Sequence, residues 1–129
     1  MTSLLADTQI VLWALDDPER LPRKVRRELE DPDTQPMFSV ISIWEIAIKT
    51  NLKRTNLRAD AREVRATLLR DGWRELEFTG EHAIVAGNLP RLHGDPFDRA
   101  LVAQASVEKV ELVTSDRRLA DYVGRVRMI

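Results

Sequence analysis

Four carboxylate residues recur at one kind of place in this chain of 129 residues, where a short apolar run gives way to a helical pattern. They are Asp7, Glu45, Asp98 and Asp116. In a parallel α/β sheet every strand-to-helix junction lies at the same edge, beyond the carboxyl ends of the strands. If the chain folds in that way, these four side chains meet in one crevice although they are far apart in the sequence.

Four carboxylates in one crevice would repel each other. Two like charges 4 Å apart cost about 4 kcal/mol at an effective dielectric of 20, and a helix N-terminus offsets only about 0.3–1 kcal/mol. A hard divalent cation would neutralise the cluster. Mg²⁺ or Mn²⁺ suits it better than zinc, because the chain has no cysteine and only two histidines, His82 and His93. Such an ion activates water and stabilises phosphoryl oxygens, so the pattern indicates phosphodiester hydrolysis.

Each acid also has a purely structural interpretation. Aspartate and serine are favoured N-caps, because their side chains accept hydrogen bonds from the free amides of the first helical turn. Asp7 and Asp116 fit caps of the helices that follow them, and residues 42–45 match a capping box in which Glu45 is the partner of Ser42. For any single residue capping is the simpler interpretation, whereas the four together favour a shared site.

Hydrophobic periodicity indicates the elements that would position these acids. Strands are expected at residues 4–6, 37–40, 73–78, 112–113 and 126–129, and helices at 8–15, 22–30, 43–50, 60–70, 79–88, 95–106 and 116–122. Strands separated by helices indicate an α/β layered fold with a mostly parallel sheet. The length fits one domain over residues 1–129.

Composition excludes several classes of protein. Hydrophobic residues make up 43% and charged residues 32% of the chain, which excludes low-complexity disorder. No run of about 18 uncharged apolar residues exists, and Asp7 comes too early for a secretory signal peptide, so we expect a cytoplasmic protein that does not enter membranes. The net charge of −1 does not by itself point to a nucleic-acid partner, although a balanced total can hide a basic rim around an acidic centre. Most of the 16 arginines, crowded at 20–27 and 54–74, are interpreted as solvated helix surface.

Taken in order, the four acidic segments resemble the motifs of PIN-domain ribonucleases, and in particular of the VapC-type toxins of bacterial type II toxin–antitoxin pairs. The segments are LLADT, SIWEIAIK, DPFDRALVAQA and LVTSD. No single motif is decisive, but the ordered set is specific, and the resemblance covers the whole chain.

The resemblance implies a three-layer α/β/α sandwich with four to five mostly parallel strands, usually in a homodimer. It also implies Mg²⁺- or Mn²⁺-dependent endonuclease activity on RNA (tRNA, rRNA or mRNA), in which activated water attacks phosphorus in line and leaves a 5′-phosphate and a 3′-hydroxyl. A cognate VapB-like antitoxin is expected to bind across the active site.

The resemblance also implies roles for individual residues. Asp7 and Asp98 would be the primary metal ligands. Glu45 and Asp116 would complete the site, either by binding a second metal ion or by orienting the attacking water. The hydroxyls of the first and fourth motifs would support them with hydrogen bonds; these belong to Thr8 and Thr114.

Several residues in or next to the motifs each have two possible interpretations. Asp95 supplies an extra acid next to the third motif; we expect it to cap the helix and prefer Asp98 as the residue that faces the metal. Arg99 would either bind the scissile phosphate or pair with Asp95. Trp13 and Trp44 would either stack RNA bases or, as we favour, anchor the core or a dimer interface. The loop residue His93 is expected to be inert.

Two other functions fit an acidic sheet edge. A phospho-acceptor receiver domain would need paired acids after the first strand and a late lysine after a strand, whereas Asp7 is unpaired and Lys109 precedes its strand. A non-catalytic interaction module with a PIN fold is the stronger alternative, although the presence of all four acids favours the nuclease.

Overall fold

The computed structural model describes residues 1–52, 59–90, 94–122 and 125–129. The strands are β1 (Thr2–Ala6), β2 (Thr34–Ser39), β3 (Arg74–Leu76), β4 (Glu111–Thr114) and β5 (Val126–Met128). The helices are α1 (Thr8–Asp16), α2 (Arg23–Glu30), α3 (Val40–Leu52), α4 (Ala61–Arg70), α5 (Gly80–Asn88) and α6 (Pro96–Glu108), with short 3-10 helices η1 (Pro18–Arg20) and η2 (Arg117–Asp121). Each element expected from periodicity is present, and the short helix expected near residue 116 is η2.

The five strands form one parallel sheet in the order β3-β2-β1-β4-β5. β1 lies at the centre, with β2 on one side and β4 on the other, so the direction of winding reverses between β1 and β4. In an open α/β sheet this switch point opens a crevice beyond the carboxyl ends of the strands. Asp7 directly follows β1 and Asp116 lies two residues after β4, so both flank the switch point.

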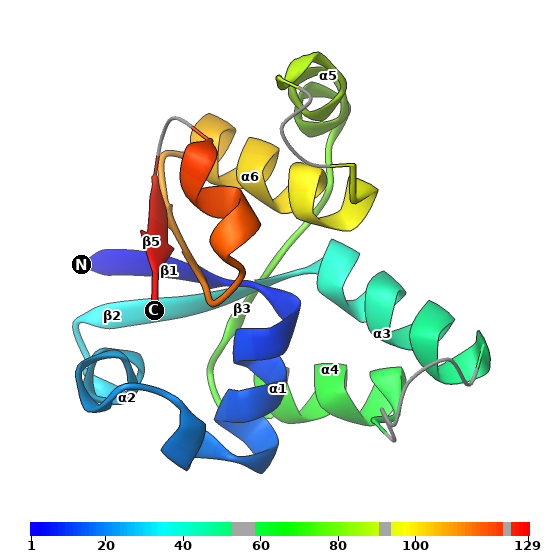
Figure 1. Cartoon of the computed structure of the whole chain (residues 1–129). Coiled ribbons are helices and arrows are strands. Elements are labelled where there is room, and N and C mark those ends of the chain that lie inside the picture. The colour runs from blue at the N-terminus through cyan, green and yellow to red at the C-terminus, as the bar shows by residue number, and fades with distance from the viewer. Residues whose placement is uncertain (53–58, 91–93, 123–124) are drawn as a thin grey trace.

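Helices cover both faces of the sheet, which confirms the three-layer α/β/α prediction (Figure 1). Successive residues of a strand point to opposite faces. Leu4 and Phe38 therefore pack into the core under α1, α2 and α4, whereas their neighbours Leu5 and Met37 pack into the core under α6 and η2. In the parts of the chain that the structure describes, no helix has the length and apolar character needed to cross a bilayer.

Two elements begin earlier than their sequence pattern predicts. β2 starts at Thr34 and contains Pro36, a residue that usually excludes a central strand. Proline is tolerated here because β3 pairs with β2 only from Met37 onward, and the Pro36 carbonyl accepts a hydrogen bond from the side chain of Gln35 instead. α3 starts at Val40, immediately after β2, with the buried Ser39 hydroxyl accepting from an amide of its first turn.

Lys109 ends α6 in the left-handed backbone conformation, with φ of 56°. A Cβ atom makes this conformation unfavourable by about 1 kcal/mol, and glycine avoids the cost. We therefore expect Lys109→Gly to raise the free energy of unfolding by about 1 kcal/mol in urea denaturation. Lys109→Ala is the control, because alanine keeps the Cβ atom and should not stabilise the chain.

Candidate active site

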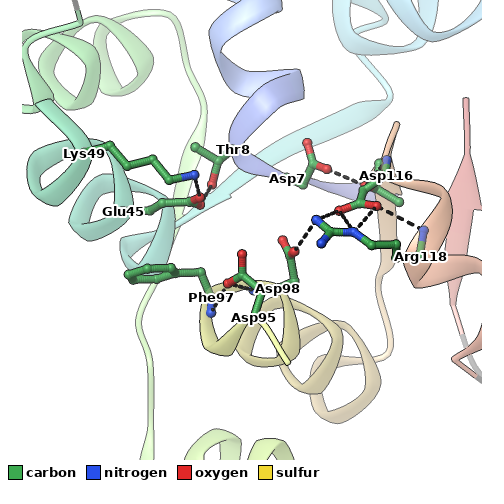
Figure 2. Close-up of polar contacts among 10 residues, drawn as sticks. Asp7, Thr8, Glu45, Lys49, Asp95, Phe97, Asp98, Asp116 and Arg118 are labelled. Carbon is green, nitrogen blue, oxygen red and sulfur yellow. Dashed lines mark hydrogen bonds and ion pairs between the residues drawn. The ribbon is translucent and has the colours of Figure 1, made fainter. Parts of the chain in front are cut away.

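An open cavity of about 630 Å³ lies beyond the carboxyl ends of the strands, between α1, α3, α6 and the start of η2. Figure 2 shows its acidic side chains converging from these separate elements. Five acids and three cations are among the residues that line it: Asp7, Glu45, Asp95, Asp98 and Asp116, with Arg20, Lys49 and Arg118. The sheet edge therefore gathers all four predicted acids, together with Asp95, around one cavity.

Asp7 caps α1 and is almost completely buried, with 5% of its surface exposed. One carboxylate oxygen accepts a hydrogen bond from the Ile10 amide at 2.8 Å, and the other accepts from the Thr114 hydroxyl. The pKa of Asp7 is raised to about 6, mainly because the carboxyl is buried and also because of the negative charges of Asp98 and Glu45; the two hydrogen bonds oppose this rise. The capping interpretation is confirmed, yet the same side chain lines the cavity.

Glu45 projects from α3 into the same cavity and is also 5% exposed. Its Oε1 accepts a hydrogen bond from the Thr8 hydroxyl at 2.6 Å, and its Oε2 contacts the Lys49 ammonium at 2.5 Å. Partial burial lowers the pKa of Lys49, but the hydrogen bond and charge of Glu45 outweigh this effect and raise the pKa above its usual value. Glu45 is thus held in place from two sides.

The predicted capping box at residues 42–45 is wrong. α3 begins at Val40, so Ser42 lies inside the helix and cannot cap it. Ser42 instead lies within hydrogen-bond distance of the Thr8 hydroxyl, with 2.9 Å between the two side-chain oxygens. Because Thr8 also donates to Glu45, the position of Glu45 depends on a contact between α1 and α3 that no short motif contains.

Asp95 and Asp98 reach the cavity from the first turn of α6. Asp95 caps that helix, as expected, by accepting from the amides of Phe97 and Asp98 at 2.9 and 3.4 Å. Its Oδ1 is occupied by these amides, whereas Asp98 lies one helical turn further and points toward Asp7 and Arg118 (Figure 2). The geometry agrees with the preference for Asp98 as the inward-facing acid.

Asp116 caps η2 and is held by Arg118 from the same short helix. The Arg118 guanidinium lies 2.7 Å from Asp116 Oδ2 and 4.0 Å from Asp98 Oδ2, so it spans the two acids. The hydrogen bond with Asp116 raises the pKa of Arg118, and the charges of Asp116, Asp98 and Asp95 add to it. The capping expectation for Asp116 is confirmed by its hydrogen bond from the Arg118 amide.

Thr8 and Thr114 lie where the resemblance requires supporting hydroxyls, next to Glu45 and Asp7 respectively. The two expected roles of Arg99, binding phosphate or pairing with Asp95, stay predictions. Its guanidinium donates to the carbonyls of Ala86, Leu89 and Pro90 at 2.9 to 3.0 Å, so it closes the C-terminal end of α5. Arg99 thereby joins α5 to α6.

Sequence reasoning missed the three cations of the cavity. Lys49 follows Glu45 by four residues, the spacing of a helical ion pair, and this signal was available in the sequence. Arg118 follows Asp116 by two residues, a spacing that predicts no contact in a regular helix. Arg20 belongs to a run of arginines interpreted as solvated surface, and only the fold brings it to the cavity, where it also stacks over Trp13.

Trp13 and Trp44 differ from each other in burial. Trp13 is partly buried against the core, in agreement with the favoured interpretation. Trp44 is 58% exposed and packs edge-to-face against Phe97, with 5.2 Å between ring centroids, so it does not anchor the core. His93 lies outside the described residues.

The donor chemistry of the cavity fits a hard divalent cation, because carboxylates line it and none of its described lining residues carries a thiolate or an imidazole. Within the described ranges, however, no three acidic or histidine side chains lie close enough to enclose one ion. Glu45 and Asp116 are engaged by Lys49 and Arg118 instead. Binding an ion through three carboxylates therefore requires side chains to move.

Comparison with known proteins identifies relatives of the whole chain. The PIN domain family model matches residues 4–124. Ribonuclease VapC22 of Mycobacterium tuberculosis (strain ATCC 25618 / H37Rv) is 32% identical over 125 residues, which cover 95% of this chain and 93% of that protein. The crystal structure of VapBC2 from Rickettsia felis bound to a DNA fragment from their promoter contains a similar fold, with a TM-score of 0.74 and 14% identity over 99% of both chains. DNA-bound VapBC from Salmonella typhimurium is similar with a TM-score of 0.68 and 15% identity over 99% of this chain and 98% of that chain.

Proposed function

The chain belongs to the PIN-domain family and to its VapC group, and on that basis we propose that it is a divalent-metal-dependent endoribonuclease and the toxin of a toxin–antitoxin pair. The observation that carries the proposal is the gathering of five carboxylates around one open cavity at the switch point of the sheet. The curated relative is a ribonuclease, which agrees with a phosphodiester substrate.

The proposed ligands of the ion are Asp7 and Asp98. Mg²⁺ or Mn²⁺ held there would supply a Lewis acid that activates water and neutralises charge on the phosphoryl oxygens. The Ile10 amide and the Thr114 hydroxyl fix the orientation of the Asp7 carboxylate, because each of its oxygens accepts one of these hydrogen bonds. This leaves the remaining lone pairs of Asp7 available to face the cavity.

Glu45 and Asp116 have the second role in the proposal, as ligands of a further ion or as groups that orient the attacking water. Glu45 is the better placed to orient water, since Thr8 and Lys49 hold its two oxygens at the cavity wall. A buried glutamate whose oxygens are already hydrogen-bonded keeps one orientation, so it can accept a hydrogen bond from the attacking water at a fixed position.

The proposed partners are an RNA substrate (tRNA, rRNA or mRNA), a VapB-like antitoxin and a second copy of the chain. The antitoxin is supported by the similar folds found in VapBC complexes. Trp44, exposed on α3 and packed on Phe97, is available to a partner surface, whereas an aromatic buried in the core would not be.

Cleavage assays test the proposed function directly. The purified chain is incubated with tRNA, rRNA and mRNA, with Mg²⁺ or Mn²⁺, and then with excess EDTA. We expect cleavage that EDTA abolishes and that added metal restores, with products that carry a 5′-phosphate. If none of these RNAs is cleaved with either ion, the non-catalytic interaction module becomes the better interpretation.

A further inference from the structure

Arg118 engages both oxygens of the Asp116 carboxylate. Its Oδ1 accepts from the Arg118 backbone amide and from Nε, both at 3.0 Å. Its Oδ2 accepts from the same Nε at 3.2 Å and from Nη2 at 2.7 Å. A carboxylate offers about four acceptor positions, and these four contacts use them all. A cation therefore cannot bind Asp116 until the guanidinium has moved away.

The Arg118 side chain is free to make that movement. It is 64% exposed, and its Nη2 lies 4.0 Å from Asp98 Oδ2, so its charge faces both acids across the mouth of the cavity (Figure 2). Exposed ion pairs of this kind are weak, because water and salt compete for both partners. The pair thus resembles a removable counter-charge more than a fixed structural bridge.

The charges in the cavity favour movement of the guanidinium once an ion binds. With Asp7 ionised, the five acids and three cations among the described lining residues carry a formal charge of −2. A divalent ion next to Asp116 and Asp98 would repel the guanidinium that holds them. A phosphate of bound RNA offers a new partner, since the planar guanidinium binds phosphate oxygens through two parallel hydrogen bonds.

We propose that Arg118 competes with the divalent ion for Asp116, and that the displaced guanidinium binds a phosphate of the RNA substrate. The inference rests on the proposed function, because it assumes a metal site and an RNA substrate at this cavity. It assigns Arg118 two successive partners: the acids when the ion is not bound, and the nucleic acid when it is. The ion and the substrate then favour each other's binding through one side chain.

Titration with Mn²⁺ tests the first half without any cleavage. Calorimetry on the full chain is compared between wild type, Arg118→Gln and Arg117→Gln. Arg117 is an exposed neighbour in the same short helix that does not line the cavity, so its replacement removes the same charge without removing the contact with Asp116. We expect Arg118→Gln to bind Mn²⁺ about two- to fivefold more tightly than Arg117→Gln, the range that a weak exposed ion pair supports.

Steady-state cleavage tests the second half, because the two halves predict opposite signs. Arg118→Gln is expected to raise the KM for RNA several-fold at saturating Mg²⁺ while leaving kcat within about twofold, and Arg118→Lys to recover part of the loss. A role limited to stabilising η2 would change neither quantity in this pattern. Thermal melting in EDTA establishes that each variant is folded.

The outcomes separate this inference from the proposed function. Equal Mn²⁺ affinity in Arg118→Gln and Arg117→Gln would overturn the competition while leaving a metal-dependent nuclease intact. Tighter Mn²⁺ binding with an unchanged KM would overturn the phosphate contact alone. A wild-type chain that binds no Mn²⁺ would overturn both the inference and the proposed function.

Discussion

Replacing Asp7 with asparagine is expected to abolish RNA cleavage and at the same time to stabilise the protein. Asparagine keeps an oxygen that can accept from the Ile10 amide or the Thr114 hydroxyl, so the cap of α1 survives. It removes the charge that would bind the ion, and a metal ion contributes several kcal/mol to stabilising a phosphoryl transition state. We therefore expect a loss of about 10³-fold or more in kcat/KM.

The gain in stability follows from the raised pKa of Asp7, which shifts from 3.8 to about 6 mainly because the carboxyl is buried. Below about pH 4 the carboxyl is protonated in the folded and the unfolded chain, and burial of a charge costs nothing. Between pH 4 and 6 only the folded chain keeps the proton, so the stability of the wild type falls as pH rises. Above pH 6 the folded chain bears the full free-energy cost of burying the ionised carboxylate. The rise in pKa from 3.8 to about 6 corresponds to a loss of up to about 3 kcal/mol in the free energy of unfolding.

Urea denaturation in EDTA at pH 4 and at pH 7.5 measures this difference. The free energy of unfolding of Asp7→Asn should exceed that of the wild type by a small amount at pH 4 and by the largest amount at pH 7.5. Asp16→Asn, an exposed acid at the end of the same helix, should change neither stability nor cleavage. Asp98→Asn should also lose cleavage, because Asp98 is the second proposed ligand of the ion. An Asp7→Asn variant that cleaves RNA normally would remove Asp7 from the proposed site.

The second large effect is expected in the pH dependence of cleavage. A proton and a divalent ion compete for the Asp7 carboxylate, whose pKa of about 6 lies close to neutrality. At low Mg²⁺ concentration, kcat/KM should fall about tenfold for each pH unit below 6, which amounts to about 100-fold at pH 4. Raising the Mg²⁺ concentration should move the midpoint of this acid limb to lower pH, because the ion stabilises the ionised carboxylate.

Rate measurements from pH 4 to 8 at several Mg²⁺ concentrations test this competition. Asp16→Asn should give the wild-type profile, since its charge does not border the cavity. A midpoint that does not respond to Mg²⁺ would show that the limiting titration belongs to a group other than a metal ligand. A rate that rises as pH falls below 6 would contradict the role of an ionised Asp7.

The alternation of apolar and amphipathic segments was sufficient to predict the layered α/β fold and the strand-to-helix junctions of Asp7 and Asp116. The physical reason is that each segment's periodicity is local, and parallel strands must share the edge where their carboxyl ends meet. The same expectation was wrong for Glu45, which lies inside α3, and for Asp98, because the element before α6 is the helix α5.

The local pattern did not predict that β2 includes Pro36. Proline is tolerated there because β3 does not pair with that part of β2, and strand pairing is a property of the whole sheet. The local pattern failed again at Ser42, because the start of α3 depends on where β2 ends.

The sequence by itself therefore determined the chemistry available to this protein: five carboxylates in a chain without cysteine. Asp7 and Asp116 follow strands, Asp95 and Asp98 lie at the start of α6, and Glu45 lies within α3.

Tertiary structure alone decided how each acid is held. The contacts of Thr8 with Glu45 and of Arg118 with Asp98 join residues more than 15 positions apart. The raised pKa of Asp7 depends on how deeply its side chain lies below the surface. Such contacts are set by the packing of whole elements against one another, which no local pattern encodes.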